Sequence, residues 1–151
     1  MNKQLEVIKK TRSNFLRMIE GLSIDQLNHI PRGFNNNIVW HLGHLVYSQQ
    51  VLCYKLGNTQ PHLNLPDFAK YGKGTKPEAF ISLEELQILK SQFESLAGLL
   101  LKDYSDKKFS SYTEYTTSYG TTLGSIEDAI AFVSVHEGLH FGYAMALKRL
   151  V

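Results

Sequence analysis

The chain has 151 residues, 43% hydrophobic and 20% charged, a size and composition sufficient for one domain with its own core. Its formal charge of +2, from 16 basic and 14 acidic residues, argues against a nucleic-acid partner, because phosphate binding usually leaves a clustered basic face. The only dense basic stretch holds Lys70, Lys73 and Lys76 among glycines, and we interpret it as a solvated loop.

The first helix is predicted at about residues 2–20. Its apolar residues recur three or four positions apart, which leaves a set of basic side chains for water: Lys3, Lys9, Lys10 and Arg12. After Ser23 a short turn is expected, which ends at Pro31.

Three further helices follow. Asn35 to Asn37 offer capping side chains for a second helix, apolar nearly all round, that runs to about Leu56 before Gly57. A capping box from Ser82 to Glu85 opens a third helix, which runs to about Tyr104. Ser125 with Asp128 opens the fourth, which continues to the end of the chain.

Two connections, residues 58–81 and 105–124, are longer than usual links between helices. The second holds Tyr112, Tyr115 and Tyr119 among Ser and Thr, a composition that fits a short hairpin as well as a binding lid. Since no strand alternation or internal repeat competes with the helices, we predict an all-α fold. The expected architecture is a four-helix bundle with two long connecting loops, a single domain over residues 1–151.

The cellular compartment is predicted from two features. Cys53 is the only cysteine, so no intrachain disulfide can form, and it is expected to be an inert core thiol. The first residues lack the apolar segment of a signal peptide, and no run reaches the roughly 20 apolar residues of a membrane span. We therefore expect a cytoplasmic protein without membrane contact.

The strongest chemical motif is HExxH, formed by His136, Glu137 and His140 in the fourth helix. Zinc proteases use this spacing with a third ligand downstream, but the eleven residues after His140 contain no His, Asp, Glu or Cys. A third ligand would have to come from upstream, where Trp40 to His44 (WHLGH) is the clear candidate segment. A protease is therefore disfavoured.

Helical geometry places His136 and His140 about 40° apart, in the middle of the apolar stripe of the fourth helix. Two core imidazoles one turn apart can share a cation, and we favour this over a pair of hydrogen-bonded core histidines. On the second helix either His41 or His44 can face inward. The angles lean towards His41 but do not decide. His29 and His62, in polar connecting segments, are interpreted as surface residues.

The stretches PRGFNNNIVWHLGHLVYSQQVLCYKLG and HEGLHFGYAMALKR resemble the DinB/YfiT-like superfamily of small four-helix metal proteins, and the resemblance covers essentially the whole chain. It implies that three histidines bind a divalent metal: His44, His136 and His140. It also implies a homodimer. Position 41 is often Asn in that family, so His41 is a departure that leaves open whether it replaces a ligand, supports one or packs.

Three imidazoles leave positions on Zn²⁺ or Ni²⁺ open for water or substrate, which favours catalysis over scaffolding. The resemblance implies a hydrolase, or a transferase that uses a low-molecular-weight thiol such as bacillithiol or mycothiol, with a small-molecule substrate. Glu137 is the candidate general base, at the rim of the apolar stripe. The alternative is a non-catalytic metal-binding or dimerising bundle with a stress-related structural role.

Overall fold

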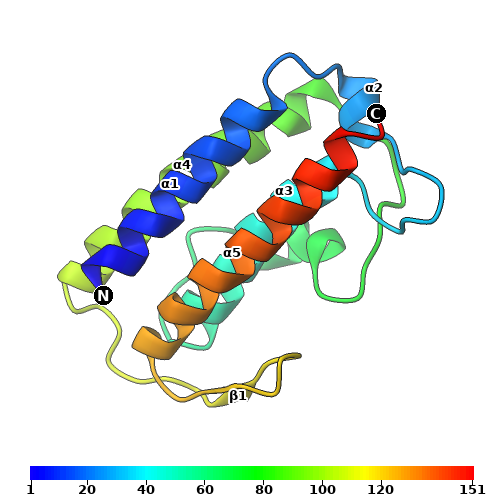
Figure 1. Ribbon diagram of the computed structural model, residues 1–151. Coiled ribbons are helices and arrows are strands. Elements are labelled where there is room, and N and C mark those ends of the chain that lie inside the picture. Colours follow the sequence, from blue (N-terminus) through cyan, green and yellow to red (C-terminus); the bar gives the residue numbers. More distant parts are fainter.

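The computed structural model describes residues 1–151, except for the side chain of residue 2. Four long helices dominate it: α1 (Asn2–Ile19), α3 (Ile38–Gln49), α4 (Leu83–Ser105) and α5 (Ile126–Lys148). Helices α1 and α5 run in one direction and α3 and α4 in the other (Figure 1). Helix α1 packs against α4 and α5, and α3 packs against the same two helices. The prediction of a mostly helical chain is confirmed.

The helices begin where the sequence predicts. The side chains of Asn37, Ser82 and Ser125 each accept a hydrogen bond from the backbone N–H three residues later and so cap α3, α4 and α5. The expected turn after Ser23 is a short helix, α2 (Ile24–Asn28), because Ser23 and Gln26 form a reciprocal capping box.

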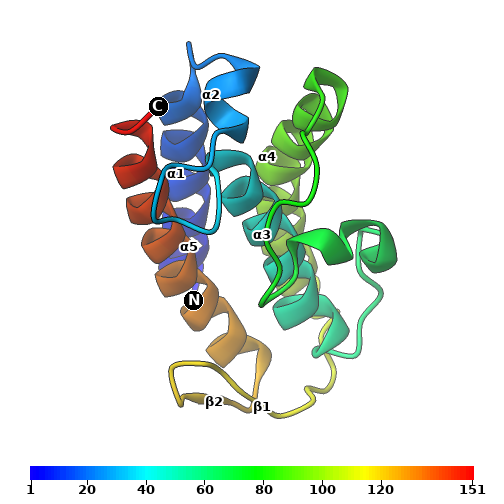
Figure 2. The ribbon, with the colours of Figure 1, turned by 90° about the vertical axis from the view of Figure 1, so that its right-hand side faces the viewer.

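The connecting segments contain short elements. Helix α3 continues directly into η1 (Gln50–Lys55), a π-helical turn, so the predicted second helix changes its winding before it ends. The 3₁₀ segment η2 (Leu65–Tyr71) packs against α3. Strands β1 (Tyr115–Thr116) and β2 (Thr122–Leu123) form an antiparallel hairpin at the end of the molecule where α4 ends and α5 begins (Figure 2).

One expectation about α1 is wrong: Arg12 does not face water. It is 1% exposed and forms an ion pair with Glu137 of α5, with Nη2 2.6 Å from Oε1. Arg12 also donates hydrogen bonds to the carbonyl oxygen of Phe93 at 2.9 Å and to Oε1 of Gln49 at 3.2 Å. Its guanidinium therefore links all four long helices, counting Gln49 at the end of α3 and Phe93 in α4.

Most of the remaining core is apolar. Cys53 is fully buried, which confirms the prediction of a core thiol. Burial raises the pKa of this thiol to about 12, so it stays protonated and unreactive at neutral pH. Among the residues that the structure describes, no helix has both the length and the apolar character needed to cross a membrane.

Candidate metal centre

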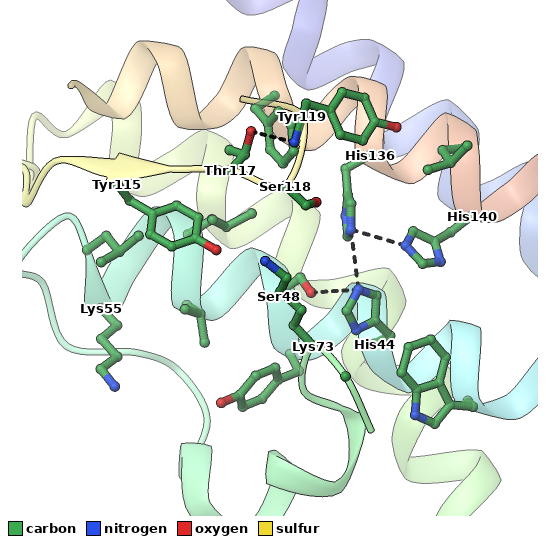
Figure 3. Close-up of a pocket in the computed structure, with 18 residues that line it drawn as sticks. His44, Ser48, Lys55, Lys73, Tyr115, Thr117, Ser118, Tyr119, His136 and His140 are labelled. Carbon is green, nitrogen blue, oxygen red and sulfur yellow. Dashed lines mark hydrogen bonds between the residues drawn. The ribbon is translucent and has the colours of Figure 1, made fainter. Parts of the chain in front are cut away.

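Three histidines from two helices point their ring nitrogens at one another (Figure 3). Nε2 of His136 lies 3.3 Å from Nε2 of His44 and 3.1 Å from Nε2 of His140. His44 comes from α3 and the other two from α5, and one ring nitrogen of each lies within 4.8 Å of the others. The fold therefore brings together the three residues that the family resemblance indicates, although His44 and His136 are 92 positions apart in the sequence.

This geometry fits a divalent metal. Nitrogens about 2.0–2.1 Å from a tetrahedral Zn²⁺ are about 3.3 Å from one another, close to the two Nε2 separations in this site. His44 Nδ1 lies 2.7 Å from the backbone oxygen of Tyr71, so its N–H donates to that carbonyl. This hydrogen bond leaves the lone pair on Nε2, the atom that faces the other two imidazoles.

The orientation of His44 depends on close packing between α3 and η2. A Cβ atom on Gly43 would come within 2.5 Å of the Tyr71 ring, so only glycine lets this ring lie against α3. On its other side His44 stacks on Trp40, with ring centroids 4.6 Å apart and planes 11° from parallel. The WHLGH segment thus contains three parts of the site. His44 is the candidate ligand, Trp40 stacks on its ring, and Gly43 leaves room for Tyr71, whose backbone oxygen accepts the hydrogen bond from His44.

His41 lies behind His140 and is not one of the three converging histidines. Its Nδ1 is 2.8 Å from Nδ1 of His140, on the side of that ring opposite the nitrogen that faces His136. A hydrogen bond there holds the ring of His140 in place and leaves its Nε2 directed at the site. Residue patterning alone did not distinguish His41 from His44, because both lie on the inner side of α3.

Burial keeps these imidazoles neutral. It lowers the pKa of His136 to about 4 and that of His140 to about 2, with neighbouring imidazoles adding to the effect. Burial also lowers the pKa of His44, although the hydrogen bond to Tyr71 opposes this shift. Neutral imidazole is the form that binds metal, so the set is ready to act as ligands at neutral pH.

Glu137 lies in the core and not at the rim of the apolar stripe of α5, where the sequence predicts it. It is 1% exposed, does not line the cavity beside the histidines, and accepts two hydrogen bonds from Arg12 on Oε1, at 2.6 and 2.9 Å. Burial raises the pKa of Glu137, and the Arg12 guanidinium opposes that rise. In this position Glu137 is engaged by Arg12 in the core between α1 and α5.

The error has a geometric cause. At about 100° per residue, Glu137 lies between the fully buried Ala144 and Ile130 on the helical wheel of α5. With His136 set to 0°, the buried residues of α5 span about 20° to 120°, so Glu137, at about 100°, lies inside this arc. His140, at about 40°, also lies within the arc, and His136 lies just outside it; both are partly exposed and face a cavity. The buried side of α5 is thus rotated by roughly 30° from the predicted apolar stripe, and this rotation places Glu137 in the core.

The cavity has a volume of about 380 Å³ and opens beside the three histidines. Its apolar wall comes mainly from the end of α3, from η1 and from α5, and includes Val51, Leu52, Leu56, Phe132 and Leu139. Tyr115, Thr117, Ser118 and Tyr119 contribute from the Tyr-rich connection, so this segment both forms a hairpin and lines the cavity. Sequence reasoning did not identify two further lining residues, Lys55 and Lys73.

The remaining histidines lie outside this site. His29 is exposed, as predicted. His62 is only partly exposed, with 31% of its side chain accessible, and its Nε2 lies 2.7 Å from the buried carboxylate of Asp103. Tyr54 and Lys108 also bind this carboxylate. This cluster fastens the segment after η1 to the end of α4.

Comparison with known proteins agrees with the fold. The sequence profile of the DinB superfamily matches residues 8–144. The crystal structure of a conserved protein from Enterococcus faecalis has a similar fold, with a TM-score of 0.67 at 14% identity, over 99% of this chain and 95% of that one. At this identity the likeness shows the fold alone. None of the curated proteins matches the chain.

Proposed function

Because the chain belongs to the DinB superfamily, we propose that it is a metal-dependent enzyme, built as a four-helix bundle, that acts on a small molecule. His44, His136 and His140 would hold one divalent ion, zinc or nickel. The observation that carries the proposal is the convergence of three neutral imidazole nitrogens at the wall of a cavity of about 380 Å³. Three protein ligands beside an open cavity are typical of catalytic metal sites, whereas structural sites are closed by a fourth protein ligand.

The composition of the cavity favours a thiol-dependent transferase over a hydrolase. None of the residues that line the cavity is Asp or Glu, and Glu137 is engaged by Arg12. No carboxylate is therefore placed to take a proton from an attacking water. A divalent ion at the three histidines would supply Lewis acidity that lowers the pKa of a ligand, and a thiol, at about 8.5, needs far less lowering than water, at about 15.7.

The surrounding residues fit the binding of such a substrate. The hydroxyl of Ser48 lies 3.3 Å from Nε2 of His44, where it can hydrogen-bond a group that reaches the histidines. With a bound substrate displacing water, the apolar wall would strengthen electrostatic interactions in the same space. His41 and the carbonyl of Tyr71 hold His140 and His44 in position from behind.

Metal analysis tests the site. Protein purified without an affinity tag is expected to contain about one divalent ion per chain, and His44→Ala and His136→Ala are each expected to lose it. His29→Ala is the matched control, because His29 is exposed and is not one of the three converging histidines. Unchanged metal content in both site variants would reject the assignment.

The reaction is tested with the zinc- or nickel-loaded protein. We expect it to accelerate the conjugation of a low-molecular-weight thiol to the electrophile monochlorobimane, and we expect chelation or His136→Ala to abolish this rate. In parallel, hydrolysis of 4-nitrophenyl acetate is measured on the same samples. Metal-dependent ester hydrolysis without thiol conjugation would identify the hydrolase instead.

The exposed side of α5 supports a homodimer. Val135, Leu139 and Tyr143 are 56%, 51% and 42% exposed, and Glu137, which is buried, is the only charged residue between Asp128 and Lys148. An uncharged apolar surface of this kind is typical of protein interfaces. Sedimentation analysis is expected to show a dimer that Val135→Glu weakens.

The non-catalytic alternative has its own signature. A protein that dimerises, melts at a lower temperature on chelation and catalyses neither reaction would support it.

A further inference from the structure

The cavity beside the histidines is unusual in its charge. Its lining contains two lysines, Lys55 and Lys73, and no carboxylate. An ion at the three histidines would add further positive charge to the same space. This positive charge would repel a cationic substrate and attract an anionic group.

Lys73 differs from its neighbours in the loop that follows η2. Lys70 is paired, with Nζ 2.6 Å from Oε1 of Glu85. Lys76 does not line this cavity. Lys73 lines it, and among the described residues no carboxylate lies within ion-pair distance of its ammonium group. A lysine in this loop is thus directed at the cavity without an internal partner.

The side-chain directions separate the two lysines. In Figure 3 Lys73 extends into the space between Ser48, Tyr115 and Ser118, next to the histidines. Lys55 lies at the left of the same view, and its ammonium group points away from the histidines (Figure 3). Only Lys73 is therefore placed to contact a molecule that also touches the histidines.

We propose that Lys73 is the anion-binding residue of this cavity, and that the substrate is an amphipathic small molecule with a carboxylate or phosphate at one end. Its anionic group binds Lys73 and the hydroxyl groups around it, its apolar part lies along Val51, Leu56 and Phe132, and its reactive end meets the three histidines. The substrate class rests on the proposed function, whereas anion binding by Lys73 does not require the metal.

Trp40 allows a direct test, because it is the only tryptophan and lines the same cavity. Its fluorescence is titrated with two thiols of equal length, 6-mercaptohexanoate and 6-mercapto-1-hexanol, in metal-free and zinc-loaded protein. We expect the acid to bind about fivefold more tightly than the alcohol in both forms, as for a partly screened ion pair. The preference should shrink as salt concentration rises.

The variants assign this preference to one side chain. Lys73→Ala is expected to remove it without weakening the binding of the alcohol, and Lys73→Glu to reverse it. Lys76→Ala, in the same loop, should leave it unchanged. Equal binding of acid and alcohol to the unaltered protein, or a preference that survives Lys73→Ala, would overturn the proposal.

The two hypotheses fail separately in this experiment. Zinc should tighten the binding of both thiols through the sulfur, and this gain should disappear in His136→Ala. If zinc has no effect but the acid preference depends on Lys73, the proposed metal function fails and the anion site stands. If zinc tightens both thiols equally and Lys73→Ala changes nothing, the metal function stands and the anion site is rejected.

Discussion

Replacing Glu137 by alanine is the sharpest test of the buried ion pair between α1 and α5. The side chains of Arg12 and Glu137 are 2% and 1% exposed, so neither charge has access to bulk water. Glu137→Ala would remove two charge-assisted hydrogen bonds and leave the guanidinium in the core with only the oxygens of Phe93 and Gln49. Loss of one partner of such a pair costs about 3–5 kcal/mol of unfolding free energy.

The effect should be easy to measure. A domain of this length loses about 2–4 °C in Tm per kcal/mol, so we expect Glu137→Ala to melt roughly 6–20 °C lower. Urea unfolding followed by helical circular dichroism gives the free energy itself. Glu94→Ala, which removes an exposed carboxylate from α4, is the control and should change stability by less than about 0.5 kcal/mol. Arg12→Met combined with Glu137→Leu should recover most of the loss, because no unpaired charge remains.

Two outcomes would refute this reasoning. A loss of less than about 1 kcal/mol in Glu137→Ala would mean that the pair does not support the core. Alternatively, a Glu137→Gln protein of unchanged stability that has lost all activity would restore the role of general base that the HExxH motif suggests.

Three further predictions concern the supports of the site and the far end of the molecule. Gly43→Ala should displace the Tyr71 ring and so remove the hydrogen bond between Nδ1 of His44 and the Tyr71 carbonyl. We expect zinc affinity, measured by competition with a chromogenic chelator, to fall about 10- to 100-fold. Unaltered affinity would show that zinc binding does not need the packing of Tyr71 against Gly43. His41→Ala should weaken zinc binding by a similar factor, and much less than His44→Ala, in the same assay; equal losses would make His41 a ligand. Burial by itself raises the pKa of Asp103, but hydrogen bonds from its three partners outweigh this effect and bring that pKa down to about 2. The ionised carboxylate therefore contributes to stability above about pH 4, and this contribution is lost as the pH falls towards 2. Melting curves of Asp103→Asn and the unaltered protein should therefore differ at pH 7 and converge near pH 2, and a constant difference would contradict this account.

Much of the fold is readable in the sequence because caps and periodicity are local. Ser82 and Ser125 each lie three residues before the backbone N–H that they bind, so the starts of α4 and α5 need no tertiary information. The signal for Arg12 was also local. At about 40° from Ile8 on the wheel of α1 it lies within the apolar stripe, and its charge alone suggested that it faces water.

The site was harder to predict from the sequence, because its geometry depends on which neighbouring elements pack against each helix. Glu137 is a plausible base in the motif, and only the packing of α1 against α5 shows that Arg12 takes its carboxylate. Lys73 belongs to a loop without periodicity, so nothing in its local sequence separates it from Lys70 or Lys76. Tyr71 acts through its backbone oxygen and ring, and neither its contact with His44 nor its fit against Gly43 has a signature in residue type.

The spacing of the three converging histidines along the chain also bears on how the protein would acquire the proposed ion. In an unfolded chain the three histidines do not converge, because His44 lies 92 positions away from His136 and is oriented only after η2 packs on α3. Tight uptake of that ion would therefore wait until the helices that carry these histidines have packed together, and partly folded or truncated molecules would compete poorly for scarce zinc or nickel. Metal occupancy in a purified sample would then report the fraction of correctly folded molecules.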